Sequence, residues 1–212
     1  MAVITISHQI GSCGREIGQK VAQKMGYPYV DREIVQGVAA RLGVTEDEAS
    51  DHDEKADSLI SQIIGSLGYT SLGGPTILNE EMAAQVGTDS YLDTAKYHKA
   101  TQQVIETVSA QGNVVIAGHG AKFYLEGRPG VLSVFIYAGT DKRVKTIMER
   151  DHLDYNRAAK VVHDNDHARS HYIKTLYHAD WSDRQNYLLL INTSLASPEL
   201  AANLIVKAAQ SY

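Results

Sequence analysis

The chain has 212 residues, of which 43% are hydrophobic and 21% are charged, and this composition is ordinary for a globular protein with a sizeable core. A net charge of −5 and a pI near 6.0 argue against nonspecific binding to nucleic acid or membranes and favour a small partner. The single cysteine, Cys13, excludes an internal disulfide and a multi-cysteine zinc site, and no apolar run or N-terminal leader pattern stands out, so we expect a cytoplasmic protein.

The first predicted unit is a strand, a glycine-spaced turn and an amphipathic helix. Residues 2–7 alternate as a short strand, and Ile17, Val21 and Met25 then recur on one helical face. Such a unit aims backbone N–H groups and a helix N-terminus at an anion. We therefore predict a phosphate-binding loop made by Gly11, Ser12, Cys13, Gly14, Arg15, Glu16 and Ile17.

This loop departs from the strict phosphate-loop motif, which places a Lys-Ser or Lys-Thr pair after its last glycine. Gly14, Arg15 and Glu16 stand there instead, and Lys20 lies a further helical turn away from the loop. Arg15 is the candidate cation, because a guanidinium can fork onto phosphate oxygens. The alternative, an exposed arginine in the first helical turn, stays open.

The glycines at 11, 14 and 18 also invite comparison with a dinucleotide-binding turn, with Asp31 as the ribose-binding acid. Their spacing differs from G-x-G-x-x-G, and none of the 12 tyrosines is followed four residues later by the lysine of short-chain dehydrogenases. An oxidoreductase that uses NAD(P) remains a distant alternative.

The next elements predict a parallel sheet interrupted by a helical insertion. A short strand at 29–31 and a helix at 32–42 precede residues 45–111, which we interpret as a helical insertion on the acceptor side, or as an ordinary insertion without a substrate role. Residues 112–118 and 131–137 are nearly continuous apolar runs, typical of buried parallel strands. Because ligands of such sheets lie beyond the carboxyl ends of the strands, His119 becomes a candidate site residue.

The second half concentrates cations in helices predicted over 140–180, before a last strand at 188–192 and a helix at 198–209. Phosphoryl transfer requires such positive charge, and the alternative is an exposed helix pair with local ion pairs. Asp166 and Arg169 share one helical face. His163, His167 and His171 also share a face, which suits a metal site or simply a polar surface.

Taken together, five segments resemble the cytidylate kinase-like family, relatives of the nucleoside monophosphate kinases. They are Ile4–Ser7 with Gly11–Gly18, Gly26–Asp31, Val114–Gly120, Asp166–Tyr172 and Tyr187–Thr193, and they keep their order over nearly the whole chain. The resemblance implies a three-layer α/β P-loop kinase-like fold, formed by a single domain over 1–212. It also implies an acceptor lobe at 45–111 and a lid-like helical segment at about 150–180.

The resemblance further implies ATP as phosphoryl donor, Mg²⁺ as its metal, and a set of site residues. Residues 11–17 would hold the donor phosphates, Asp31 would contact the acceptor or a metal, and Asp166 and Arg169 would contact the acceptor. Arg15, Arg150, Arg157 and Arg169 would act on the transferred phosphoryl group. No residue is assigned as a dedicated metal ligand. One departure is His119, which replaces an acceptor-binding arginine of cytidylate kinases.

The expected function is therefore ATP-dependent phosphoryl transfer to a small acceptor, with a nucleoside monophosphate such as CMP as first candidate. A non-catalytic nucleotide-binding or regulatory module is the alternative, because the Lys-Ser/Thr pair is missing. Nucleic acid and membranes are not expected partners, and the oligomeric state is left open.

Overall fold

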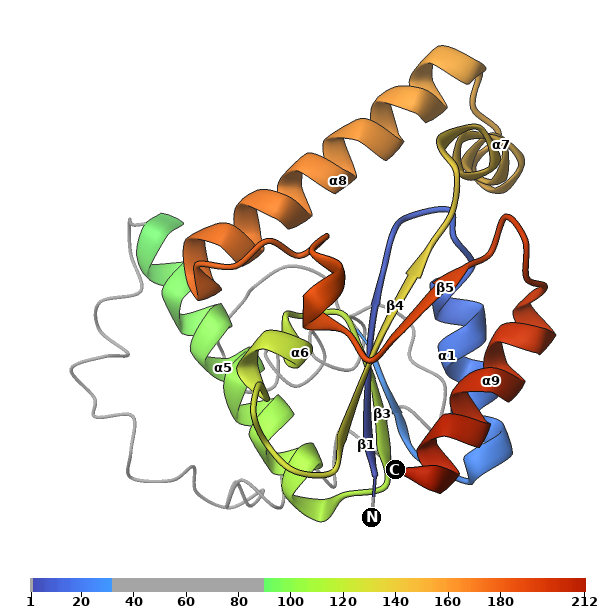
Figure 1. Cartoon of the computed structure of the whole chain (residues 1–212). Coiled ribbons are helices and arrows are strands. Elements are labelled where there is room, and N and C mark those ends of the chain that lie inside the picture. Colours follow the sequence, from blue (N-terminus) through green and yellow to red (C-terminus); the bar gives the residue numbers. More distant parts are fainter. Residues whose placement is uncertain (1, 32–89) are drawn as a thin grey trace, which may run out of the picture. The chain divides into compact units, whose positions relative to one another are not determined.

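The computed structural model describes residues 2–31 and 90–212, with the backbone alone for residues 90–97 (Figure 1). The chain divides into two compact units, Met1–Tyr29 with Gly112–Tyr212 and Val30–Gln111. The helix predicted at 32–42 and most of the predicted insertion, up to residue 89, lie outside the described residues. None of the described helices is long and apolar enough to cross a membrane.

The first unit contains the sheet and most of the described helices. Its strands are β1 (Val3–His8), β3 (Val114–Ala117), β4 (Val131–Tyr137) and β5 (Leu189–Asn192). The short strand β2 (Tyr29–Val30) spans the boundary between the units, because Tyr29 belongs to the first unit and Val30 to the second. Its helices are α1 (Gly14–Met25), α6 (Ala121–Tyr124), α7 (Thr140–Asp151), α8 (Tyr155–Tyr177), the 3₁₀ turn η1 (Arg184–Asn186) and α9 (Pro198–Ser211).

The sheet has the strand order β2-β3-β1-β4-β5. β1 lies parallel to β3 and to β4, and β4 lies parallel to β5. In the register, Ile6 of β1 faces Ala117 of β3 and Val134 of β4. The carboxyl ends of these strands therefore meet at one edge, where α/β proteins bind their ligands.

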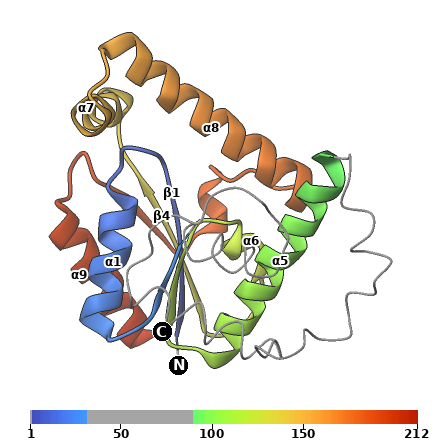
Figure 2. The ribbon, with the colours of Figure 1, turned by 180° about the vertical axis from the view of Figure 1, so that it is seen from behind.

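Helices cover both faces of this sheet, as the sequence predicts. On one face, Ile17 and Val21 of α1 and Ile205 of α9 pack with Ile4 and Ile6 of β1 in one buried cluster, and α1 and α9 lie side by side (Figure 2). On the other face, a second cluster contains Phe123 of α6, Phe135 of β4, Ile173 of α8, Trp181 and Tyr187. The result is the predicted three-layer α/β arrangement.

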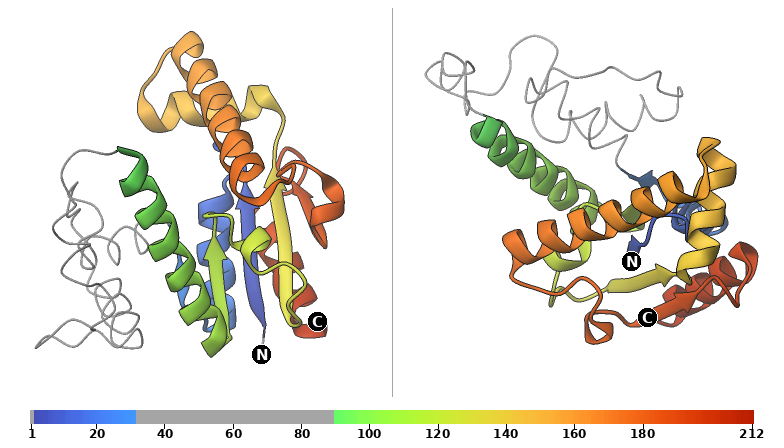
Figure 3. Two further views of the ribbon diagram at one scale, coloured as in Figure 1. Left: turned by 90° about the vertical axis from the view of Figure 1, so that its left-hand side faces the viewer. Right: turned by 90° about the horizontal axis from the view of Figure 1, so that it is seen from above.

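The cation-rich segment, predicted as helical over 140–180, forms two helices. α7 ends at Asp151, and α8 begins after Asp154, whose carboxylate accepts a hydrogen bond from the Arg157 backbone N–H at 2.9 Å. Val144 and Ile147 of α7 pack with Ala158 and Val162 of α8. Figure 3 shows the pair extending beyond the carboxyl ends of β1 and β4.

The second unit is described mainly through α5 (Ser90–Gln111), which lies within the helical insertion that the sequence predicts at 45–111. Its buried residues are Ala100, Thr101, Val104, Ile105 and Val108. These positions recur at spacings of three and four, so one face of α5 is buried.

Candidate functional site

The predicted phosphate loop connects the end of β1 to the beginning of α1. Gly11 and Cys13 both have left-handed backbone conformations, with φ of 76° and 60°. Cys13 is the N-cap of α1 and makes no side-chain capping hydrogen bond, whereas Asp154 and Ser197 do cap α8 and α9. The first-turn amides of α1 have no carbonyl partner within their own helix, so they suit an anion.

The loop is fixed to the sheet through Ser12, which is fully buried. Its hydroxyl donates to the carbonyl of Gln9 at 2.7 Å and to that of Ile136 at 3.3 Å. Its carbonyl accepts a hydrogen bond from the hydroxyl of Thr193 at 3.1 Å. Ser12 therefore acts on the site by holding the loop in shape, with its side chain already engaged.

Ile17 contributes to the site in the same indirect way. Its side chain is fully buried in the core, and its backbone N–H donates to the Cys13 carbonyl at 3.0 Å within the first turn of α1. The anion-binding groups of the predicted 11–17 segment are therefore those before Ile17. Cys13 itself has a raised pKa, because burial and the neighbouring Glu16 disfavour the thiolate.

His8 at the end of β1 packs directly over Gly14. A Cβ atom added to Gly14 would lie 2.3 Å from the Cβ and Cγ atoms of His8, so a lysine side chain at this position would collide with the imidazole. Desolvation lowers the pKa of His8 to about 4, and the positive charges of Arg169 and Arg15 act in the same direction. His8 is neutral at pH 7 in this environment.

Arg169 reaches the loop from α8. Its guanidinium donates to the backbone carbonyl of His8 and lies over the Trp181 ring, 5.9 Å from the ring centroid. Arg15, exposed in the first turn of α1, is close enough for its charge to lower the pKa of His8. Two of the predicted phosphate-binding arginines thus meet at the beginning of the loop.

His119 lies at the same edge of the sheet as the loop. It follows β3 between Gly118 and Gly120, and all three residues have positive φ angles, of 82°, 56° and 69°. The Gly118 backbone N–H donates to the Ile6 carbonyl of β1 at 2.9 Å, which holds this turn beside the strand that precedes the loop. Asp31 is buried and belongs to the second unit, and its acceptor role stays a prediction.

Asp166 is engaged by an arginine that the sequence analysis did not assign to the site. The Asp166 carboxylate accepts two hydrogen bonds from the Arg143 guanidinium, at 2.9 and 2.8 Å. Arg143 is buried, with 4% of its surface exposed, and its backbone packs against Gly11. The pair therefore connects α8 through α7 to the loop.

Arg150 and Arg157 lie on either side of the turn that joins α7 to α8. Arg150 pairs with Asp151 at 2.6 Å, and Arg157 pairs with Asp154 at 3.3 Å. Both arginine side chains are more than half exposed. Each of these side chains is thus held by a neighbouring aspartate beside the α7–α8 turn, whereas Arg169 contacts His8 before the loop.

Metal binding finds little support among the groups of this region. Within residues 2–31 and 98–212, no group of three or more His, Cys, Asp or Glu side chains is arranged to hold a metal ion. His163, His167 and His171 on α8 therefore do not form such a group. Glu16 is exposed in the first turn of α1 and lies 3.9 Å from Lys20.

Sequence reasoning did not assign three further residues to the site: His8 and Thr193, which contact the loop or its flank, and Lys142, which contacts Thr193. Lys142 lies in the first turn of α7, and its ammonium donates to the Thr193 carbonyl. Thr193 is buried directly after β5. All three follow or end strands at the carboxyl edge of the sheet, and this position is the signal that points to them.

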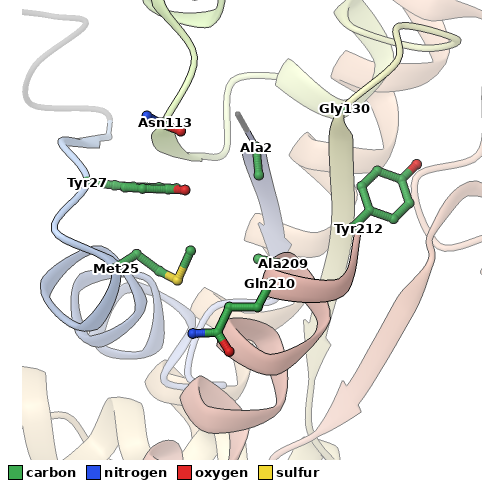
Figure 4. Close-up of a pocket in the computed structure, with 8 residues that line it drawn as sticks. All are labelled: Ala2, Met25, Tyr27, Asn113, Gly130, Ala209, Gln210 and Tyr212. Atoms are coloured by element: carbon green, nitrogen blue, oxygen red, sulfur yellow. The ribbon is translucent and has the colours of Figure 1, made fainter.

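A pocket of about 370 Å³ lies at the opposite edge of the sheet (Figure 4). Ala2, Asn113 and Gly130, which precede three of the strands, line it together with Tyr27 and Tyr212. It is remote from the carboxyl ends of the strands and from the loop cations. It is therefore not part of the candidate phosphate site.

Comparison with known proteins gives a family and one curated relative. A sequence profile described as the cytidylate kinase-like family matches residues 3–195. A cytidylate kinase of Sulfolobus acidocaldarius is 27% identical over 108 residues, which are 51% of this chain and 59% of that protein. The matched region thus spans less than two thirds of that relative.

Solved structures support the fold. A protein of Eubacterium ventriosum, titled uncharacterized, superposes with a TM-score of 0.68 at 20% identity, over 100% of this chain and 99% of the other. Shikimate kinase from Acinetobacter baumannii, in complex with shikimate, superposes with a TM-score of 0.52 at 14% identity, over 100% and 94%. The chain has an α/β kinase-like fold and belongs to the cytidylate kinase-like family.

Proposed function

We propose that this protein transfers a phosphoryl group from ATP to a small acceptor, with a nucleoside monophosphate such as CMP as the first candidate. The observation that carries the proposal is the meeting of Arg169 from α8 with the loop that precedes α1, through the His8 carbonyl. A loop that leads into a helix without a side-chain N-cap, with guanidinium groups near its beginning, suits the phosphates of a nucleotide. Family membership and fold agree with a kinase.

In this proposal the chain works by positioning and by charge. Amides of the loop and the first turn of α1 hold the donor phosphates, with Arg15 and Arg169 pairing with their oxygens. Phosphoryl transfer spreads negative charge over the equatorial oxygens, and cations held near them lower the barrier. Arg150 and Arg157 would act as lid residues that approach when the α7–α8 pair closes.

Mg²⁺ in such enzymes is bound through substrate phosphates and one or two carboxylates. Glu16, in the first turn of α1, fits the position of a carboxylate near the donor phosphates, directly or through water. Mg²⁺ would neutralise phosphate charge there. His119, Asp31 and Asp166 remain the proposed acceptor-side residues, and Asp166 would act while paired with Arg143.

A non-catalytic nucleotide-binding module is the second candidate, and one observation favours it. Arg15 and Glu16 follow Gly14 in place of the Lys-Ser/Thr pair of the strict motif, so the loop itself carries no lysine. A sensor of this kind would bind nucleotide through the same amides and arginines, without turnover.

The test is ADP release from ATP in the presence of a panel of acceptors. The panel contains the nucleoside monophosphates, the hydroxy acid shikimate and other small alcohols. We expect turnover with one class of acceptor, and a strong loss in the R169M variant. The control is R184M, which changes an exposed arginine in η1. Nucleotide binding without turnover on every acceptor would favour the sensor instead.

A further inference from the structure

Lys142 is the cation that the sequence-based site left out, and the structure connects it to the phosphate loop. It lies in the first turn of α7, and its ammonium donates a hydrogen bond to the carbonyl of Thr193. The Thr193 hydroxyl in turn donates to the carbonyl of Ser12 in the loop, at 3.1 Å. One buried residue therefore separates the ammonium from the loop.

The charge of Lys142 also acts on the loop directly. It favours the thiolate of Cys13, although burial and Glu16 outweigh it in the pKa of that thiol. An electrostatic effect on Cys13 means that the ammonium lies near the N-cap of α1. This is the end of the helix where a phosphate would bind.

Lys142 differs from other lysines of the helical segments in what it contacts. Lys145, Lys160 and Lys122 lie within 4.0 Å of the carboxylates of Glu149, Asp164 and Glu126. Lys142 contacts a neutral carbonyl, and no carboxylate among the described side chains forms an ion pair with it. A lysine held this way can exchange the carbonyl for an anion, because a phosphate adds the attraction of opposite charges to the hydrogen bond.

We propose that Lys142 supplies the ammonium of the phosphate site, leaving the Thr193 carbonyl to contact a phosphate oxygen of the bound nucleotide. This inference rests on the proposed function. It supplies an ammonium that the loop itself lacks, because Arg15 and Glu16 follow Gly14 where the strict motif has a Lys-Ser/Thr pair. The four-carbon stem of lysine gives the ammonium the reach and freedom for this movement.

The competing explanation is structural: Lys142 only holds Thr193, and through it the loop, in place. The two explanations differ in what a substitution changes. A structural lysine stabilises the protein without nucleotide. A phosphate-binding lysine changes nucleotide affinity and adds little stability to the empty protein.

The experiment compares K142M with K145M. The second variant removes an exposed lysine that lies three residues further along α7. Calorimetric titration of the full chain with ADP and with a non-hydrolysable ATP analogue, each with Mg²⁺, gives the dissociation constants. We expect K142M to weaken binding about 10- to 100-fold and K145M less than about 2-fold. K142R should restore part of the affinity, and the thermal unfolding of the three empty variants should match the wild type.

A second readout is independent of nucleotide. The rate at which iodoacetamide alkylates Cys13 should fall in K142M, because the thiolate loses a neighbouring positive charge, and should stay unchanged in K145M. If K142M proves unstable, K142R and K142Q are compared below their unfolding temperatures, where affinity for the nucleotide still separates a cation from a neutral side chain.

Two failures are distinguishable. Wild-type affinity in K142M, while the wild type binds nucleotide, would overturn the role of Lys142 and leave the proposed function standing. A wild type that binds neither nucleotide would overturn both. An equal loss of stability and affinity in K142M and K142R would favour the structural explanation and overturn the proposal.

Discussion

The guanidinium of Arg143 and the carboxylate of Asp166 form a two-pronged ion pair, with hydrogen bonds of 2.9 and 2.8 Å. The arginine side chain is only 5% exposed and the aspartate side chain is 28% exposed. The pair connects α7, whose backbone at Arg143 packs on Gly11, to α8, which carries Arg169. A carboxylate that sequence reasoning assigns to the acceptor thus also holds the two cation-bearing helices together.

The first prediction concerns this pair. D166N should lower the free energy of unfolding by about 2–3 kcal/mol, because it leaves the Arg143 charge buried without a counter-charge. R143M should cost less, since Asp166 is better hydrated, and the double variant should lose less than the sum of the two. Urea unfolding measures all three. D164N, which breaks an exposed pair with Lys160 on the same helix, should change stability little. Equal effects of D166N and D164N would refute the structural role.

The second prediction separates steric contact from backbone strain at Gly11. Both Gly11 and Gly26 have positive φ, of 76° and 67°. A Cβ at Gly11 would lie 2.6 Å from the Arg143 carbonyl oxygen, whereas a Cβ at Gly26 would meet no atom of the described residues within 4 Å beyond its chain neighbours. G26A should therefore lose about 1 kcal/mol from the conformation alone, and G11A about 2–4 kcal/mol. Similar losses in denaturant unfolding would mean that the loop does not press on α7.

The third prediction is a dependence of stability on pH caused by His8. Its pKa is about 4 in the folded protein, below the ordinary value of 6.5, so the unfolded chain binds the proton more readily. The stabilisation is complete above pH 6.5 and is lost as the pH falls towards 4, by about 2–3 kcal/mol. Unfolding curves between pH 7 and pH 4 measure it.

The matched variant for this prediction is H8Q, which should flatten the pH dependence over that interval. H163Q changes an exposed ring on α8 and serves as the control. If H8Q and H163Q follow the wild-type profile equally well, His8 does not carry the effect.

The fourth prediction concerns Arg150 and Arg157. Each is exposed and paired with an aspartate beside the α7–α8 turn, so R150M and R157M should leave the unfolding temperature nearly unchanged. As lid residues in the proposed kinase they should lower turnover more than about tenfold in the ADP-release assay. Wild-type turnover in both variants would remove them from the catalytic set and leave Arg15 and Arg169.

Local patterns in the sequence predicted the fold well. Strand alternation at 2–7, the glycine that ends α1 and the apolar runs of β3 and β4 are all readable from neighbouring residues. The sequence predicts helices over 140–180 without placing the break between α7 and α8, although Asp154 is a typical helix N-cap. The helical pattern of residues continues on both sides of this position, so the boundary between the helices could not be placed.

The site was harder to predict because its contacts join residues far apart in the sequence. Arg169 lies 161 residues from His8, and Thr193 lies 181 residues from Ser12. The residues around position 142 form no pattern that distinguishes Lys142 from Lys145 on the same helix. Lys142 comes close to the loop only through the fold of the chain.

The central claim is that the loop between β1 and α1 binds the phosphates of a nucleotide. The most direct test follows the backbone amide resonances of the ¹⁵N-labelled chain while ADP and Mg²⁺ are added. We predict saturable shifts of Gly11, Cys13, Gly14 and Arg15, with the amides around Ala2 and Tyr212 at the opposite edge unchanged. Resonances of the loop that stay fixed up to millimolar nucleotide, or shifts confined to that opposite edge, would contradict the account.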